Sequence, residues 1–256
     1  MDRGNVTDAK FAIRGDLQQS ALIVDNHELV ANSLASILRS CGASATVLRV
    51  GGLTVDSAVE VVTAQCGDAV KPPLALIDLN LKPDLDGVDL IAPLTNAGAK
   101  VVVVSGVTDR IRLGRCIEAG AVALINKGLP FEEFGRAISR LVAGENVMAI
   151  WEKENLVAEY HYHERERRQR LATLSRLTHR EAQVLAALVG GLVASEIAED
   201  FCVSIATIRS EIRSILTKLA VHSQLEAIEL TVGAEWRPDL IQHKSRGSTG
   251  KFHQPW

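Results

Sequence analysis

Four side chains that could handle a phosphoryl group stand at the ends of short apolar runs in the first half of the sequence. Asp25 follows ALIV, and Asp78 ends LALID. Ser105 ends VVVVS, and Lys127 follows ALIN. Two neighbouring carboxylates would attract a hard divalent cation such as Mg²⁺, which prefers carboxylate oxygens and retains several waters. A carboxylate can also attack phosphorus to form an acyl phosphate. The cation, an ammonium and a hydroxyl could then hold the phosphoryl oxygens.

These side chains need a scaffold that gathers the ends of separate strands. Residues 20–144 alternate short apolar runs with amphipathic helical patterns, and the runs lack internal alternation, which is typical of strands buried on both faces of a parallel sheet. We therefore predict an α/β doubly wound (βα)5 parallel sheet, whose ligands bind outside the carboxyl ends of the strands. The predicted strands are 21–24, 46–50, 74–79, 100–105 and 121–125, and the predicted helices are 28–40, 56–66, 87–97, 108–119 and 131–143.

Each of the four residues alone has an ordinary structural explanation. Asp25 could cap the helix that follows it, and Asp78 could simply end a strand. Ser105 could begin a turn, and Lys127 could be a solvated lysine. The four together, each at the matching end of its strand, favour a phosphorylation site over these separate explanations.

Residues 20–144 resemble the receiver domain of bacterial two-component response regulators in the segments ALIVDNHELV, LALIDLNL, VVVVSG and ALINKG. The resemblance implies that Asp78 is the phosphoacceptor, that Ser105 is the switch hydroxyl and that Lys127 binds the phosphate. It also implies a sensor histidine kinase or another phosphodonor as a partner. The ligands that it implies for Mg²⁺ are Asp25, Asn26, Asp78 and, through its backbone carbonyl, Asn80.

Two positions depart from the receiver pattern. The family usually has a second acid directly after the first, and this position is Asn26. An amide oxygen can still ligate, but the loss of one negative charge should weaken Mg²⁺ binding. The aromatic residue that often moves with the switch is replaced by Leu124. These departures leave an alternative open: a receiver that acts as a phosphorylation-independent dimerisation or ligand-sensing module.

The second half of the sequence has helical patterns. The mixed-charge run HERERRQR suits a solvated helix or a charged linker, and Thr178 with Glu181 forms a capping box. We predict an all-α four-helix domain with helices near 178–189, 195–201, 204–219 and 224–232. The predicted divisions are a mobile extension 1–19, the receiver domain 20–144, a helical or charged linker 145–174, a DNA-binding domain 175–235 and a disordered tail 236–256.

The segment from Leu177 to Leu230 resembles the LuxR-type helix-turn-helix of the NarL/FixJ subfamily. In the predicted helix after Ser204, apolar residues at helical spacing favour one buried face. Arginines on the other face could read guanine or contact phosphate in the major groove. The predicted buried residues are Ile205, Ile208, Ile212, Ile215, Leu216 and Leu219. The DNA-facing residues that the resemblance implies are Arg209, Ser210 and Arg213, with Thr207 and Lys218 as candidate phosphate contacts.

The charge of this segment works against DNA binding. Residues 177–232 hold four basic and seven acidic side chains, a net charge of −3. Nonspecific attraction to phosphate should therefore be weak, and binding should depend on dimerisation and local contacts. Glu211 could accept a hydrogen bond from cytosine. Val193 stands where the family commonly has a serine cap.

The sequence as a whole predicts a cytoplasmic transcription regulator that is a homodimer, binds DNA and is not an enzyme. The apolar runs are too short to cross a bilayer, no secretory signal is visible, and the four scattered cysteines are interpreted as reduced core residues. An α/β phosphohydrolase could use Asp78 as nucleophile, but Asn80 cannot transfer protons as the usual second acid does. An acyl-homoserine-lactone sensor shares the C-terminal domain but would not need the acid–serine–lysine order.

Overall fold

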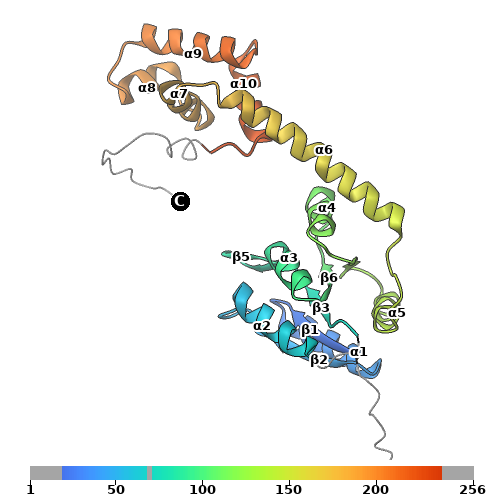
Figure 1. Cartoon of the computed structure of the whole chain (residues 1–256). Helices are drawn as coiled ribbons and strands as arrows, with labels where there is room; N and C mark the ends of the chain where they lie inside the picture. The colour runs from blue at the N-terminus through green and yellow to red at the C-terminus, as the bar shows by residue number, and fades with distance from the viewer. Residues whose placement is uncertain (1–18, 68–70, 238–256) are drawn as a thin grey trace, which may run out of the picture. The chain divides into compact units, whose positions relative to one another are not determined.

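The computed structural model describes residues 19–67 and 71–237 and places a five-stranded parallel sheet in the first half of the chain (Figure 1). The strand order is β2-β1-β3-β6-β7, and every neighbouring pair is parallel. The doubly wound α/β prediction is confirmed. The sheet strands are β1 (Ser20–Val24), β2 (Ser44–Leu48), β3 (Leu74–Ile77), β6 (Lys100–Ser105) and β7 (Ala123–Asn126).

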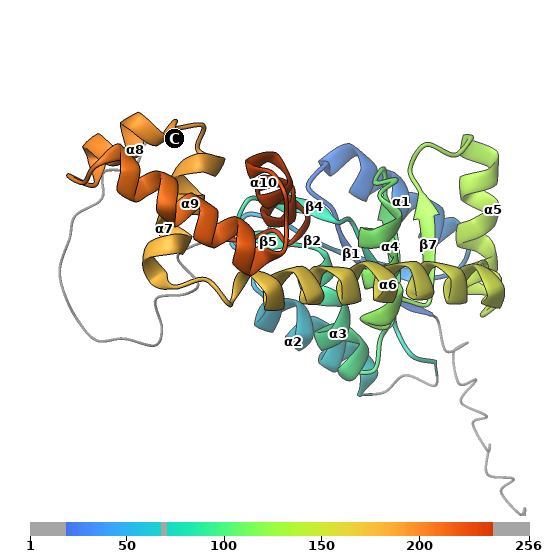
Figure 2. The same ribbon diagram turned by 90° about the horizontal axis from the view of Figure 1, so that it is seen from above.

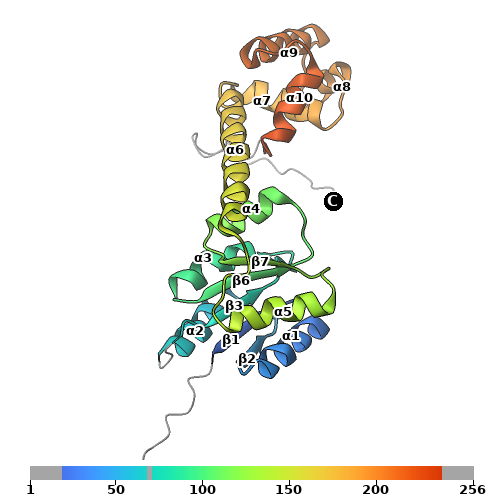
Figure 3. The ribbon, with the colours of Figure 1, turned by 90° about the vertical axis from the view of Figure 1, so that its right-hand side faces the viewer.

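Helices cover both faces of the sheet (Figure 3). One core lies beneath α1 (Glu28–Ser40) and α5 (Phe131–Val142). The other lies beneath α2 (Val55–Cys66), α3 (Val88–Asn96) and α4 (Arg110–Glu118). The strand β3 is buried along its whole length, as its unbroken apolar run predicts. The prediction of burial on both faces is wrong for β2, because every side chain of this edge strand is partly buried or exposed.

A short antiparallel hairpin that the sequence pattern did not predict follows the third sheet strand. It pairs β4 (Asn80–Lys82) with β5 (Leu85–Asp86), with an irregular register between them. Strands of two or three residues are too short to show a hydrophobic period. The hairpin matters because it fixes the backbone directly after Asp78.

The long helix α6 (Ile150–Leu174) follows the sheet domain. The described residues form two compact units, one extending to Tyr160 and one beginning at His161, so α6 contributes residues to both. The helix α6 lies within the predicted linker 145–174. The exact limits of the predicted domains stay predictions. Most of the extension 1–19 and of the tail 236–256 lies outside the described residues.

Among the described residues of the second unit, four further helices surround a core of their own (Figure 2). The predicted four-helix arrangement is confirmed. Contrary to the prediction, Ile205 is not buried: 43% of it is exposed, because it lies in the first turn of its helix, whereas Ile208 and Ile212 reach the core. The four helices are α7 (His179–Val189), α8 (Ala194–Asp200), α9 (Ile205–Leu219) and α10 (Gln224–Gly233).

The start of α8 is capped from within the helix. The side chain of Glu196 accepts a hydrogen bond from the backbone nitrogen of Val193 at 2.8 Å. This is the glutamate half of a capping box, and it satisfies one free amide where Val193 has no side-chain oxygen to offer. The missing serine is thus partly compensated by Glu196.

The cysteines are all free thiols, but they are not all core residues. Burial raises the pKa of Cys116 to about 12, and this side chain is the only fully buried thiol among the described residues. Cys41 and Cys66 are partly buried, and Cys202 is exposed. Cys202 lies in the turn between α8 and α9 with φ +51°, so turn geometry rather than packing places it at the surface. The core prediction is therefore wrong for Cys202.

Within the described residues, no helix combines the length and the apolar character needed to span a bilayer.

Candidate functional site

The strand register places the four predicted phosphorylation residues at one edge of the sheet. The ends of the strands are aligned, with Val24 opposite Ile77 and Ile77 opposite Val103. Asp78 extends this alignment, because its backbone nitrogen donates to the carbonyl of Val24 at 2.8 Å. Ser105 pairs with Asn126 at the end of the next two strands. The parallel topology therefore gathers residues that lie far apart in the sequence.

The side chains of this edge contact one another directly. The Lys127 ammonium lies 2.6 Å from Asp25 Oδ2 and 2.9 Å from Asp78 Oδ2. The Ser105 hydroxyl donates to Asp78 Oδ1 at 2.8 Å. Both carboxylates and the hydroxyl are buried. One carboxylate oxygen of Asp78 thus accepts from a hydroxyl and the other lies beside a cation. The same hydroxyl and cation could bind the negatively charged oxygens of a phosphoryl group attached to Asp78.

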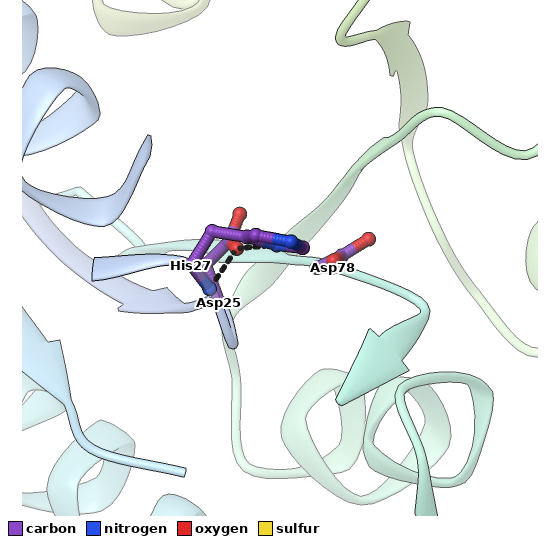
Figure 4. Close-up of side chains that lie close together, drawn as sticks. All are labelled: Asp25, His27 and Asp78. Carbon is purple, nitrogen blue, oxygen red and sulfur yellow. Dashed lines mark hydrogen bonds and ion pairs between the residues drawn. The ribbon is translucent and has the colours of Figure 1, made fainter. Parts of the chain in front are cut away.

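The two carboxylates also offer a place for a metal ion. Asp25, His27 and Asp78 each place a ligand atom within 4.8 Å of the others (Figure 4). The backbone nitrogen of His27 donates to Asp25 Oδ1 at 2.9 Å. The buried Asp25 Oδ2 has the Lys127 ammonium at 2.6 Å, and a carboxylate oxygen can accept from more than one partner. A carboxylate oxygen with spare acceptor capacity, beside a second carboxylate, fits a hard cation such as Mg²⁺.

The remaining predicted ligands border this cluster. Asn26 and Asn80 are exposed, and together they line an open pocket of about 410 Å³. His27 was not predicted as a member of the site. Its imidazole is exposed and offers nitrogen, whereas Mg²⁺ prefers oxygen, so we do not include it among the proposed magnesium ligands.

The backbone after Asp78 is held in a tight turn by Gly87. Its nitrogen donates to the carbonyl of Leu79 at 2.9 Å. A Cβ atom at this position would overlap the carbonyl oxygen of Asp78, so the close approach requires glycine. The sequence does not reveal this role, because nothing marks Gly87 as lying against a residue nine positions earlier.

Arg112 is a further residue of this region that sequence reasoning missed. Its guanidinium extends from α4 to the segment that follows Asp78, donating to Asn80 Oδ1 at 2.9 Å and to the Leu79 carbonyl at 3.1 Å. It also lies 3.0 Å from Asp86 Oδ1. Sequence pattern offered no signal, because Arg112 stands on a surface helix more than thirty residues after Asn80.

A second candidate site lies on α9 in the C-terminal unit. Thr207, Arg209, Ser210 and Arg213 are all exposed, whereas Ile208 and Ile212 on the other side are buried. Ser204 caps the helix, accepting a hydrogen bond from the nitrogen of Thr207 at 3.1 Å. The helix α9 packs on α7 and α8 through its apolar side, which leaves the arginine side uncovered within this unit.

The two other basic residues of the segment 177–232 each form an ion pair with a glutamate of that segment. Lys218 Nζ lies 2.6 Å from Glu181 Oε2, and Arg180 lies 3.5 Å from Glu211 while its guanidinium stacks on Phe201. Glu211 therefore pairs with an arginine of its own domain, and Lys218 pairs with a glutamate of the same domain. These contacts favour structural roles for both residues over the predicted base and phosphate contacts.

Glu181 is the centre of this internal network. Its burial alone would raise the pKa, but hydrogen bonds from Lys218, Ser214 and Thr178 outweigh burial and lower the pKa of Glu181 to about 2. Ser214 donates at 2.7 Å, and the backbone nitrogen of Thr178 donates at 2.8 Å. The predicted capping residue thus also joins the start of α7 to the middle of α9.

Comparisons with known proteins find a different family in each half of the chain. A family model for the response regulator receiver domain matches residues 21–139, and one for bacterial regulatory proteins of the luxR family matches residues 175–231. The transcriptional regulatory protein DesR of Bacillus subtilis is 25% identical over 217 residues, which cover 85% of this chain and 98% of DesR.

Two further comparisons extend over both halves of the chain. The response regulator protein VraR of Staphylococcus epidermidis is 28% identical over 210 residues, covering 81% of this chain and 93% of VraR. The crystal structure of full-length FixJ from B. japonicum is 21% identical and covers 86% of this chain and 98% of FixJ, with a TM-score of 0.39. With a receiver domain followed by a LuxR-type DNA-binding domain, the chain belongs to the response regulators of the NarL/FixJ type.

Proposed function

We propose that this response regulator is phosphorylated on Asp78 with the help of Mg²⁺, and that phosphorylation changes its dimerisation and its binding to DNA. The observation that supports the first part is the contact geometry of Asp78. Its carboxylate lies between the Ser105 hydroxyl and the Lys127 ammonium, with the Asp25 carboxylate held by the same ammonium. These are the acceptor, hydroxyl, cation and metal-binding carboxylate that phosphoryl transfer needs.

The proposed reaction follows from these contacts. An oxygen of Asp78 attacks the phosphorus of a phosphodonor, such as the phosphohistidine of a sensor histidine kinase or acetyl phosphate. The bond between phosphorus and the donor breaks, its electron pair leaves with the donor, and an acyl phosphate forms on Asp78. Lys127 and Ser105 then bind phosphoryl oxygens. Mg²⁺ bound by Asp25, Asn26, Asp78 and the Asn80 carbonyl would supply positive charge for the remaining oxygen.

Arg209 and Arg213 provide the proposed DNA contacts. Residues 177–232 carry net negative charge. The other two basic residues of this segment, Arg180 and Lys218, each pair with a glutamate of the same segment. Within the described residues, no acid forms an ion pair with Arg209 or Arg213. These two arginines, with Ser210 and Thr207 on the same exposed side, therefore form a local positive face on a domain of the opposite net charge.

We further propose that the protein acts as a homodimer in the cytoplasm and regulates transcription. A single domain with so few free basic groups should attract phosphate weakly, whereas two domains on two half-sites would add their contacts. Dimerisation is thus the simplest way to reach useful affinity. It also gives phosphorylation of the receiver a means to control DNA binding.

Arginine substitutions test the proposed DNA face. We expect Arg213→Ala and Arg209→Ala each to weaken binding to a duplex selected by the wild-type protein from a random pool, by about 1 to 3 kcal/mol if the side chain binds guanine. If the side chain instead contacts phosphate, the number of counterions released on binding, which the salt dependence reports, should fall by about one. Fluorescence anisotropy at several salt concentrations measures both effects.

A matched charge control is available outside the DNA-binding unit. Arg136 is an exposed arginine of α5, and Arg136→Ala removes the same charge from the chain. We expect this variant to bind the selected duplex like the wild type. Equal loss in all three variants, or no loss in any, would contradict the assignment to α9.

The phosphorylation-independent receiver stays the main alternative. The exposed Asn26 in place of an acid and the partly buried Leu124 in place of an aromatic residue favour it. In that case the receiver would dimerise or bind a ligand without forming an acyl phosphate. A titration of Mg²⁺ with a stable phosphoryl analogue separates the two readings, because saturation at millimolar metal supports the phosphorylated receiver.

A further inference from the structure

We propose that Arg112 is a positioning residue that joins the segment after the phosphoacceptor to the linker helix α6 through α4. This proposal deepens the proposed function, because it names the route by which the state of the receiver could reach the helix that leads into the DNA-binding unit. It rests on contacts on two sides of one short helix. All of these contacts lie within the first compact unit.

On one side of α4, Arg112 holds the acceptor segment at three points. Its acceptors are the Asn80 side chain, the Leu79 carbonyl and the Asp86 carboxylate, all at 2.9 to 3.1 Å. The Leu79 carbonyl also accepts from Gly87, so the guanidinium joins an existing turn. A planar guanidinium can serve several acceptors in a fixed geometry, which a lysine ammonium cannot do.

The held segment is the one that metal or phosphate binding would disturb. Leu79 is bonded directly to the phosphoacceptor Asp78, and Asn80 is the proposed source of a metal-binding carbonyl. The Asp86 carboxylate also accepts from the nitrogen of Val88 at the start of α3. A change in this backbone therefore alters the acceptors of Arg112 directly.

On its other side, α4 lies against the first part of α6 (Figure 1). Arg110 Nε donates to Glu159 Oε2 at 2.7 Å. A Cβ atom on Gly114 would overlap the backbone carbonyl of Leu156 and lie 2.8 Å from Tyr160 Cβ. The two helices therefore touch backbone to backbone at Gly114. Such a close crossing allows little movement of one helix without the other.

The spacing of these residues explains how one helix serves both contacts. Arg110 and Gly114 are four residues apart and share one face, whereas Arg112 lies two residues from each and projects from the opposite side. The helix has nine residues and so is about 13 Å long, short enough to move as one rigid piece. A displacement at Arg112 is then a displacement at Gly114. This route does not use Leu124, the position at which the family's aromatic residue is missing.

Amide hydrogen exchange in the full-length protein tests this coupling without DNA or a phosphodonor. We expect Arg112→Ala to give several-fold faster exchange in residues 79–86 and also in residues 150–160. The matched control is Arg115→Ala on the same helix, because Arg115 contacts Asp89 of α3 at 3.3 Å instead of the acceptor segment. This control should leave both segments at the wild-type rate.

The outcomes are distinct. Faster exchange in residues 79–86 alone would overturn the proposal, and so would the same acceleration of residues 150–160 in both variants. If Arg112→Ala fails to fold, Arg112→Lys should show the same two-segment effect with smaller size, since it keeps the charge but not the three contacts. A second arm adds Mg²⁺ and beryllofluoride to the wild type. No response there would count against phosphorylation of Asp78, while the comparison of resting variants would still decide the role of Arg112.

Discussion

Replacing Asp78 with asparagine is expected to abolish transfer of a phosphoryl group from acetyl phosphate to the protein. An amide cannot form an acyl phosphate. The substitution also removes one negatively charged carboxylate from the proposed Mg²⁺ site. The buried surroundings can hold an amide, because the Ser105 hydroxyl donates a hydrogen bond to this position and the Lys127 ammonium lies 2.9 Å from it. Intact-protein mass spectrometry would detect the added phosphoryl group in the wild type and its absence in the variant.

The control for this experiment is Asp109→Asn. Asp109 is an exposed acid that caps α4 by accepting from the nitrogens of Ile111 and Arg112, and asparagine caps helices as well as aspartate does. We expect Asp109→Asn to be phosphorylated like the wild type. Labelling of Asp78→Asn to the wild-type level would show that another residue accepts the phosphoryl group.

Replacing Glu181 with glutamine is expected to destabilise the DNA-binding unit by about 2 to 3 kcal/mol. Glutamine can still cap α7, but it lacks the charge that pairs with Lys218 and that holds the pKa of Glu181 at about 2. The slowest amide exchange in α7 and α9 reports the free energy of unfolding of this unit. DNA binding should weaken only as far as the folded population falls.

The pH dependence follows from the same pKa. Because the pKa of Glu181 is lower in the folded state than its ordinary value of 4.5, its contribution to stability is complete above about pH 4.5. The contribution is lost as the pH falls from there towards 2. Acid unfolding followed by circular dichroism should therefore show a loss of stability in this window that Glu181→Gln lacks.

A matched control for Glu181 lies in α10. Glu226 occupies the same capping position in α10, accepting from the backbone nitrogen of His222 at 2.8 Å, but it has no lysine partner among the described residues. Glu226→Gln should change stability by less than about 0.5 kcal/mol, because the cap is retained and no ion pair is lost. Equal destabilisation by both substitutions would assign the effect to capping rather than to the Glu181–Lys218 pair.

The grouping of the four residues of the proposed phosphorylation pocket could be predicted from sequence because they follow one rule. Asp25, Asp78, Ser105 and Lys127 stand at the ends of apolar runs, and parallel strands bring those ends together. The burial of Ile208 and Ile212 likewise follows from helical spacing. Ile205 obeys the same spacing but is exposed, because periodicity does not show where the core ends.

The contacts that join one element to another were not predictable in this way. Arg112 reaches Asn80 across 32 residues, and Glu181 reaches Lys218 across 37. Both pairs depend on how helices pack, which no local pattern records. Lys218 illustrates the consequence, since a basic residue on a recognition helix suggests phosphate until its internal partner is known. The turn at Gly87 is similar, because only the packed backbone shows why a Cβ atom is excluded.

The central claim is that phosphorylation of Asp78 controls DNA binding, and the most direct test is the affinity of the full-length protein for a selected duplex with and without Mg²⁺ and beryllofluoride. We predict that the phosphoryl mimic changes the affinity of the wild type by about 5- to 150-fold, the usual range of coupling between two sites, and leaves Asp78→Asn unchanged. Equal affinity of both proteins in every condition would contradict this account and would favour a receiver that works without phosphate.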